Sequence, residues 1–120
     1  MSRTLPWYAW YANDFAGAVR GWSILERGGL REALDAQWTL DGLPADPEEL
    51  RRVINATPRE WLRIWPRIEA KLPIAADGKR RNPRLEQERK RGSRVSELRS
   101  QIGKLGAEKR WRQNGHNHAS

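Results

Sequence analysis

Apolar residues in the first 76 positions recur mainly at spacings of three and four, the pattern of helices with one buried face. Leu30, Leu34 and Trp38 mark the first such helix. A capping box predicts its start, because Ser23 stands three residues before Glu26 and each side chain can bind the other residue's backbone N–H. We therefore expect one amphipathic helix whose apolar face packs on the rest of the body.

Two more helix starts follow. Asp46 precedes Pro47, and Thr57 precedes Pro58, so each start combines a capping side chain with a proline at the first helical position. The apolar face of the second of these helices comprises Trp61, Ile64, Trp65, Ile68 and Leu72. Two helices joined by a short turn, here Asn55-Ala56, form a helix-turn-helix.

Residues 72–82 predict a small β-hairpin, because Asp77-Gly78 lies between an apolar and a basic run. Helix, helix and hairpin in this order are typical of a winged helix with its wing. The expected fold is mainly α with a small β-hairpin, a winged-helix or helix-turn-helix body over residues 1–82.

The segment 5–11 is aromatic and alternating, which predicts a short strand. Its rings either form core or offer a stacking platform for single-stranded nucleic acid, and core is the interpretation we favour. Gly28 and Gly29 interrupt the first helix at a cost of about 1 kcal/mol each relative to Ala. They indicate either close packing, for which this strand is the candidate neighbour, or a local break.

Residues 83–112 predict a basic helical arm that opens at Asn82-Pro83, with a possible break at Gly92. Residues 113–120 are expected to be a disordered tail. The arm carries four apolar residues at the spacing of a coiled-coil seam, Val95, Leu98, Ile102 and Leu105. This seam is either a homodimer contact or a stripe that lies on the core.

Charge divides the chain in two. Residues 1–76 hold ten Lys/Arg and ten Asp/Glu, whereas residues 77–120 hold thirteen against five, which accounts for the whole net charge of +8. A basic arm on a neutral body is typical of proteins that bind nucleic acid, and double-stranded DNA is the expected partner. The chain has no Cys, no membrane-length apolar run and no signal peptide, so we expect a cytoplasmic protein.

Three groups of cations are candidates for nucleic-acid contact. The first is a stripe at four-residue spacing, Arg59, Arg63 and Arg67, and the second is the wing group, Lys79, Arg80, Arg81 and Arg84. The third belongs to the arm: Arg89, Lys90, Arg91, Arg94, Lys104, Lys109, Arg110 and Arg112. The alternative for stripe and wing is a solvated surface. Trp111 either stacks on a base or anchors the arm on the body.

No enzyme, cofactor or metal site is expected. Helix capping explains Asp46, Glu49, Glu26 and Glu60, which leaves no carboxylate cluster to hold Mg²⁺, and the sequence suggests no pair of nucleophile and base. His116 and His118 share the letters of a nuclease motif but stand in a polar tail, without the surrounding ligands that such a metal site needs.

Several separated motifs in this order resemble the YdaU-like family of phage and prophage proteins. They are PWYAWYANDF, LERGGLREALDAQW, GLPADPEELRRVINATPREWLRIWP, DGKRRNPRLEQERKR and GAEKRW, across residues 5–112. One departure is Leu30, where members of the family commonly have Tyr. The resemblance implies a phage context and a DNA-binding role in replication or regulation, and it implies no catalytic residues.

The expected function is therefore that of a phage-type DNA-binding protein in replication initiation or its regulation. Two alternatives remain. One is an adaptor whose body binds a replication or host protein, and the other is an inhibitor of a host nucleic-acid-binding machine. In both, the arm would serve dimer or partner contacts.

Overall fold

Four of the five described helices begin directly after the capping residues that the sequence predicts. Ser23 and Thr57 each form a complete capping box immediately before the first residue of a helix, and Asp46 Oδ2 accepts from the N–H of Glu49. Asn82 Oδ1 accepts from the N–H of Leu85 at 3.1 Å and so caps the last helix. These side chains satisfy N–H groups that have no partner within their own helix.

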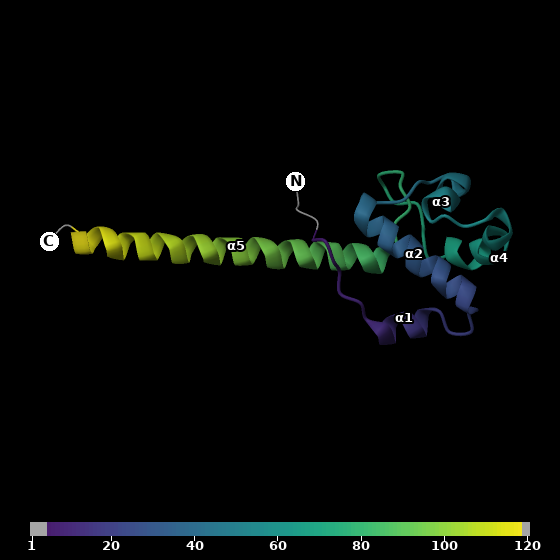
Figure 1. Cartoon of the computed structure of the whole chain (residues 1–120), viewed down its shortest axis with the longest axis horizontal. Helices are drawn as coiled ribbons and strands as arrows, with labels where there is room; N and C mark the ends of the chain where they lie inside the picture. The colour runs from purple at the N-terminus through teal and green to yellow at the C-terminus, as the bar shows by residue number, and fades with distance from the viewer. Residues whose placement is uncertain (1–4, 119–120) are drawn as a thin grey trace.

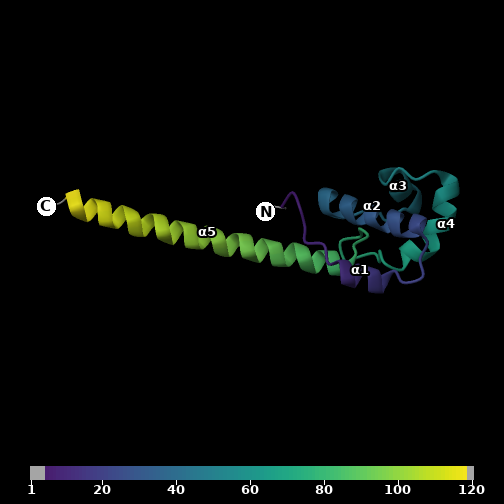
Figure 2. The same cartoon turned by 60° about the horizontal axis from the view of Figure 1, so that its bottom comes forward.

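The computed structural model describes residues 5–118, with side chains as far as Trp111. The helices are α1 (Ala12–Ala18), α2 (Ile24–Leu40), α3 (Pro47–Val53), α4 (Pro58–Glu69) and α5 (Pro83–His118). Helices α1–α4 and the first turns of α5 form the body, and the rest of α5 projects from it, away from α4 (Figures 1 and 2). The molecule measures 77 × 28 × 23 Å along its principal axes.

The core of the body lies between α2 and α4. Leu30 of α2 and Ile64 and Ile68 of α4 are buried. The helices approach closely at Gly29, where an added Cβ would lie 2.7 Å from Ile64 Cδ1 and 2.8 Å from Ile68 Cδ1. Of the glycine pair, only Gly29 therefore marks close packing, and its neighbour is α4 and not the N-terminal segment. Helix α2 continues through both glycines without a break.

Residues 72–82 form a turn, and the prediction of two β-strands there is wrong. Within residues 5–118 no strand forms, and Arg80 instead makes two isolated antiparallel bridges, one to Ile74 and one to Leu43. Pro73 has no N–H to continue a ladder beyond Ile74, and Asn82 is already engaged as the cap of α5. The turn itself, at Asp77-Gly78, lies where the sequence predicts it.

The predicted strand at residues 5–11 is also wrong, because within the described residues this extended segment has no neighbouring strand with which to pair. It lies across α2 instead. Trp38 Nε1 donates to Leu5 O at 2.6 Å, and the Tyr8 hydroxyl donates to Asp35 Oδ1. The Tyr8 and Trp38 rings are 5.2 Å apart. Tyr8 and Trp10 thus pack against the core, as we favoured, whereas Trp7 is 63% exposed.

Helix α5 is continuous through Gly92, so the possible break there is wrong. Its first turns belong to the body, because Leu85 is buried and a Cβ at Gly92 would lie 3.4 Å from Leu5 Cδ1. The expected boundary at residues 82/83 therefore falls inside a packed region.

Helix α5 also includes residues 113–118, which we expected to be disordered, while residues 119–120 lie outside those described. No described helix is both long and apolar enough to span a membrane.

The packing at Gly29 can be tested against its neighbour Gly28, which has nothing within 4 Å of an added Cβ. We expect Gly28→Ala to raise the free energy of unfolding by about 0.5–1 kcal/mol, because Ala favours the helix. Gly29→Ala should lower it by about 1–2 kcal/mol, because overpacking of Ile64 and Ile68 outweighs the same propensity gain. Urea unfolding of both variants measures the difference, and equal effects would contradict this account of the core.

Candidate nucleic-acid interface

Arg80 is a structural residue of the body and not a surface contact of the turn. Its side chain is directed inward, the residue is only 8% exposed, and the guanidinium carbon lies 5.0 Å from the centre of the Trp65 ring. Nε donates to Ala45 O at 2.8 Å and Nη1 donates to Leu72 O at 3.1 Å. Arg80 thus joins the turn to the chain before α3 and to the end of α4, a role that leaves little of it for DNA.

Arg81 is the centre of an ion-pair cluster. Its guanidinium contacts Asp41, Asp77 and Glu86 at 2.8–2.9 Å, and its side chain is mostly buried. Hydrogen bonds from Arg81 lower the pKa of the Asp41 and Asp77 carboxyl groups, and those same bonds raise the pKa of Arg81. The positive charge of Arg81, one of the four cations predicted for a DNA-binding wing, is therefore neutralised within the protein.

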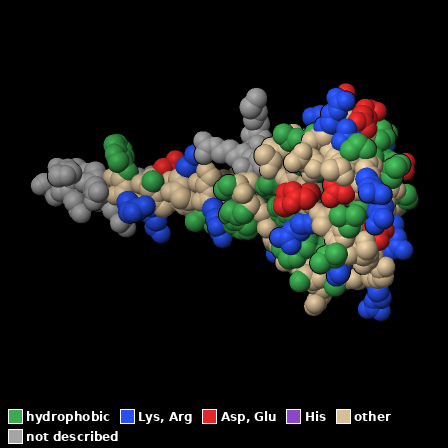
Figure 3. Space-filling model, turned by 45° about the vertical axis from the view of Figure 1, so that its right-hand side comes forward, with side chains coloured by type: hydrophobic (Ala, Val, Ile, Leu, Met, Phe, Trp, Pro, Cys, Tyr) green, Lys and Arg blue, Asp and Glu red, His purple; other side chains and the backbone are tan. Residues whose placement is uncertain are grey.

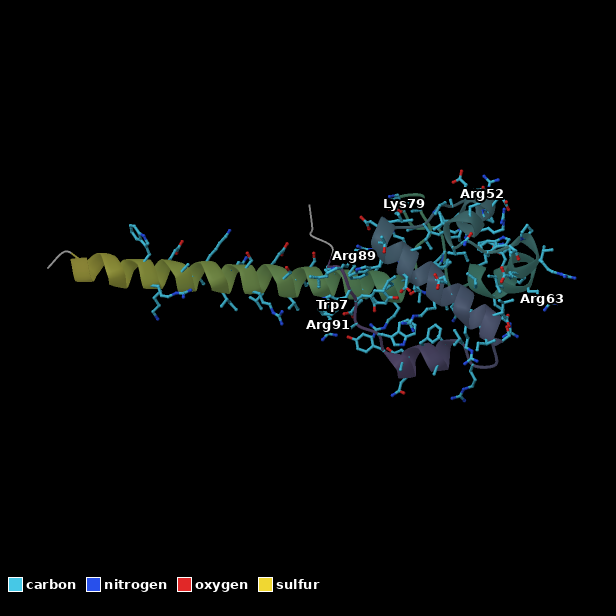
Figure 4. All side chains as sticks on the ribbon, viewed as in Figure 1. Trp7, Arg52, Arg63, Lys79, Arg89 and Arg91 are labelled. Carbon is cyan, nitrogen blue, oxygen red and sulfur yellow. The ribbon has the colours of Figure 1, made fainter. Side chains whose placement is uncertain are left out.

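The first cations of α5 are likewise held by the body. Arg89 lies over the Trp38 ring at 4.5 Å and donates to Gln37 O and Trp38 O, each at 3.0 Å. Arg84 pairs with Asp14 at 3.0 Å. Arg91 is exposed and donates to the Tyr11 hydroxyl (Figure 4). These three arginines fasten α5 to α2 and to the N-terminal segment.

The predicted stripe on α4 is divided. Arg67 pairs with Glu26 at 3.0 Å and donates to Gly21 O at 3.2 Å, so it connects α4 to the start of α2. Arg59 and Arg63 are exposed and form no ion pair with any described residue. Leu62 lies between them and is 78% exposed. The outward surface of α4 therefore offers two available guanidinium groups around one apolar side chain.

The available positive charge of α5 lies beyond its packed first turns. Among the described residues 90–111, no Lys or Arg forms a salt bridge, and nearly all of their side chains are exposed. Figure 3 shows basic side chains along the projecting helix, whereas the visible face of the body mixes both signs. The predicted residues in this group are Lys90, Arg94, Lys104, Lys109 and Arg110. Sequence reasoning missed Arg99, and the side chain of Arg112 lies outside those described.

The predicted basic groups do not form one continuous face. Figure 4 shows Arg63 at the end of the body opposite to the exit of α5, and Lys79 at a third location beside the turn. Lys79 is exposed and makes one long contact, from Nζ to Asp41 O at 3.4 Å. Trp111 is exposed near the far end of the arm, so it does not anchor the arm on the body. Its stacking on a base stays a prediction.

Among the described residues, no group of three or more His, Asp or Glu is arranged to hold a metal ion. The side chains of His116 and His118 lie outside the described part. No family model, no curated protein and no solved structure matches this chain.

The role of Arg80 can be separated from that of its exposed neighbour. Arg80→Met should lower the free energy of unfolding by roughly 2–3 kcal/mol, because the carbonyl groups of Ala45 and Leu72 lose their donors. Lys79→Met, the matched control, should change it by less than about 0.5 kcal/mol. Thermal and urea unfolding measure both, and similar stabilities would show that Arg80 is not structural.

The Arg81 cluster predicts a response to acid. The pKa values of Asp41 and Asp77 are below their ordinary value of 3.8 in the folded state, so the cluster stabilises the fold above that pH and loses this effect as pH falls further. Arg81→Met should lower stability at neutral pH and make the loss between about pH 4 and pH 2 shallower. Urea unfolding over this range is the measurement. Arg84→Met, the control, breaks the exposed ion pair with Asp14 and should leave the pH dependence of the free energy of unfolding as in wild type. A steeper pH dependence for Arg81→Met would overturn the assignment.

Proposed function

We propose that this protein binds double-stranded DNA through the outward surface of α4 and the projecting part of α5. The observation that carries the proposal is the run of exposed cations over residues 90–111, none of which has an acidic partner among the described residues. Phosphates are the natural partners of such a surface, because each contact releases counterions from the DNA. The proposed role is phage replication initiation or its regulation.

The order of elements supports a winged-helix origin for the body. Helix α2, the bridge residue Leu43, helices α3 and α4, and the turn between the bridge residues Ile74 and Arg80 follow one another as in that fold. Asn55, with φ of 59°, makes the tight turn between α3 and α4. In this interpretation α4 is the helix that enters the major groove.

The outward surface of α4 suits such contact. Arg59 and Arg63 are one helical turn apart, so both can reach phosphates or the acceptor atoms of guanine. Leu62 can contact a thymine methyl group. Trp61 and Trp65 stack at 4.8 Å behind this surface, which gives α4 a rigid support.

The turn at residues 75–79 contributes little to the proposed interface. Arg80 and Arg81 are engaged with the body, so Lys79 is the cation of the turn that remains available. The mechanism differs here from an ordinary winged helix, because α5 supplies the charge that a basic wing would supply. The motif resemblance to the YdaU-like family supports the phage context of this proposal.

An adaptor role is the second candidate, and one observation favours it. Trp7 is 63% exposed and lines a groove between the N-terminal segment and α5, together with Leu5, Gly92 and Val95. Exposed tryptophan beside a groove is common at protein-binding surfaces. A replication or host protein would be the partner in this case.

Paired charge removals test the DNA-binding proposal. Arg59→Gln/Arg63→Gln and Lys104→Gln/Lys109→Gln should each reduce the slope of log K against log salt by about 2 units. The matched control is Arg20→Gln/Arg27→Gln, which removes two exposed cations elsewhere and should leave the slope nearly unchanged. Fluorescence anisotropy with single- and double-stranded DNA over a salt series measures all four proteins.

Two outcomes would contradict the proposal. One is that the full-length protein binds no DNA at low salt, and the other is that the control pair reduces the slope as much as the test pairs. If single strands bind more tightly than duplex and only the α5 pair matters, α4 is not a recognition helix.

A further inference from the structure

The seam on α5 is unpartnered in the structure. Val95, Leu98, Ile102 and Leu105 are 42%, 57%, 60% and 65% exposed, and they lie on the part of the helix that projects from the body (Figure 1). The alternative that this stripe lies on the core is therefore wrong. The spacing of three, four and three places all four side chains along one side of the helix, as in a coiled coil.

A helix of this composition needs a neighbour. Isolated helices are marginal in water, and Gly103 and Gly106, where an added Cβ would meet nothing within 4 Å, each weaken this one by about 1 kcal/mol. Most helical stability in proteins comes from packing of an apolar face. The seam supplies such a face, and beyond Val95, which lines a groove beside Trp7, no described part of the body covers it.

We propose that the seam is covered by α5 of a second copy of this chain, in an antiparallel coiled coil. Charge at the positions that flank the seam selects the orientation. In a parallel pair, Arg94 of each copy would face Arg99 of the other, which gives two repulsive contacts. In an antiparallel pair that matches Val95 with Leu105, Arg94 of each copy faces Glu108 of the other.

The antiparallel arrangement thus gains two ion pairs. Its like-charge contacts are one approach of Arg99 to Arg99 at the centre and two approaches of Arg91 to Lys109 at the ends, and a parallel pair would have as many at these end positions. Arg91 and Lys109 occupy the next seam positions and end the apolar stretch on both sides. Val95 also lines the groove beside Trp7, so the seam continues onto the body.

A seam this short, between chains of net charge +8, gives a weak dimer that salt strengthens by screening repulsion. Electrostatic binding to DNA has the opposite salt dependence.

Sedimentation equilibrium of the full-length protein without DNA tests the proposal. Leu98→Ala/Ile102→Ala should weaken the dimer about 100-fold, because it removes the central apolar contacts from both copies. Ser100→Gln/Ala107→Gln, on the opposite side of the same helix, is the matched control and should dimerise like wild type. Circular dichroism of both variants monitors the helix.

Charge reversal tests the orientation. Arg94→Glu and Glu108→Arg should each weaken the dimer by roughly 10-fold, and the double variant should restore it, because the pair is re-formed with exchanged signs. In a parallel dimer Arg94→Glu would tighten association, since the introduced carboxylate would then face Arg99 of the other copy.

A monomer at the highest soluble concentration, or a dimer that tolerates the loss of Leu98 and Ile102, would overturn the proposal. The DNA titration of Arg59→Gln/Arg63→Gln changes residues outside the seam and does not depend on this result, so either proposal can fail alone.

Discussion

The structure depends on how the buried Gln37 holds the start of α5. Its amide Nε2 donates to Glu86 Oε1 at 2.9 Å and to Asn82 O at 3.3 Å, while its Oε1 accepts from Asn82 N at 2.7 Å. Asn82 in turn caps α5, and Glu86 binds Arg81. A buried amide must find all of these partners, because each one left unpaired is costly. This network therefore determines where α5 begins and in which direction it leaves the body.

The same junction explains why charge alone is a poor guide to the interface. The basic cluster that begins at Lys79 consists of two kinds of residue. Arg80, Arg81 and Arg89 are buried or half-buried against Trp65, Trp38 and the carboxylates around Asp41, and they build the joint. Apart from Arg91, which donates to the Tyr11 hydroxyl, the cations from residue 90 onward have no such partners among the described side chains, and they are displayed by the helix that the joint directs. Arginine serves both purposes because its planar, multi-donor head stacks on rings and binds carbonyl groups as well as anions.

Local signals in the sequence were enough to predict the helices with caps, since Ser23, Asp46, Thr57 and Asn82 act through bonds within three residues. The spacing on α4 likewise predicted its buried face. Predictions that depended on distant partners failed. Residues 5–11 have strand composition but no strand beside them, and the inward direction of Arg80 follows from carbonyl groups 8 and 35 residues away. Short α1 was missed because it lacks a capping side chain and buries none of its residues.

The central claim is that the basic residues divide into a structural joint and an available surface. Backbone amide chemical shifts of the full-length protein, followed by NMR as a DNA duplex is added, test it directly. The account predicts progressive shifts for α4 around Arg59 and Arg63 and for α5 from Arg94 to Arg110. It predicts little change at residues 80, 81 and 89. Large shifts confined to the turn and to Arg80, Arg81 and Arg89, with α5 unaffected, would contradict it.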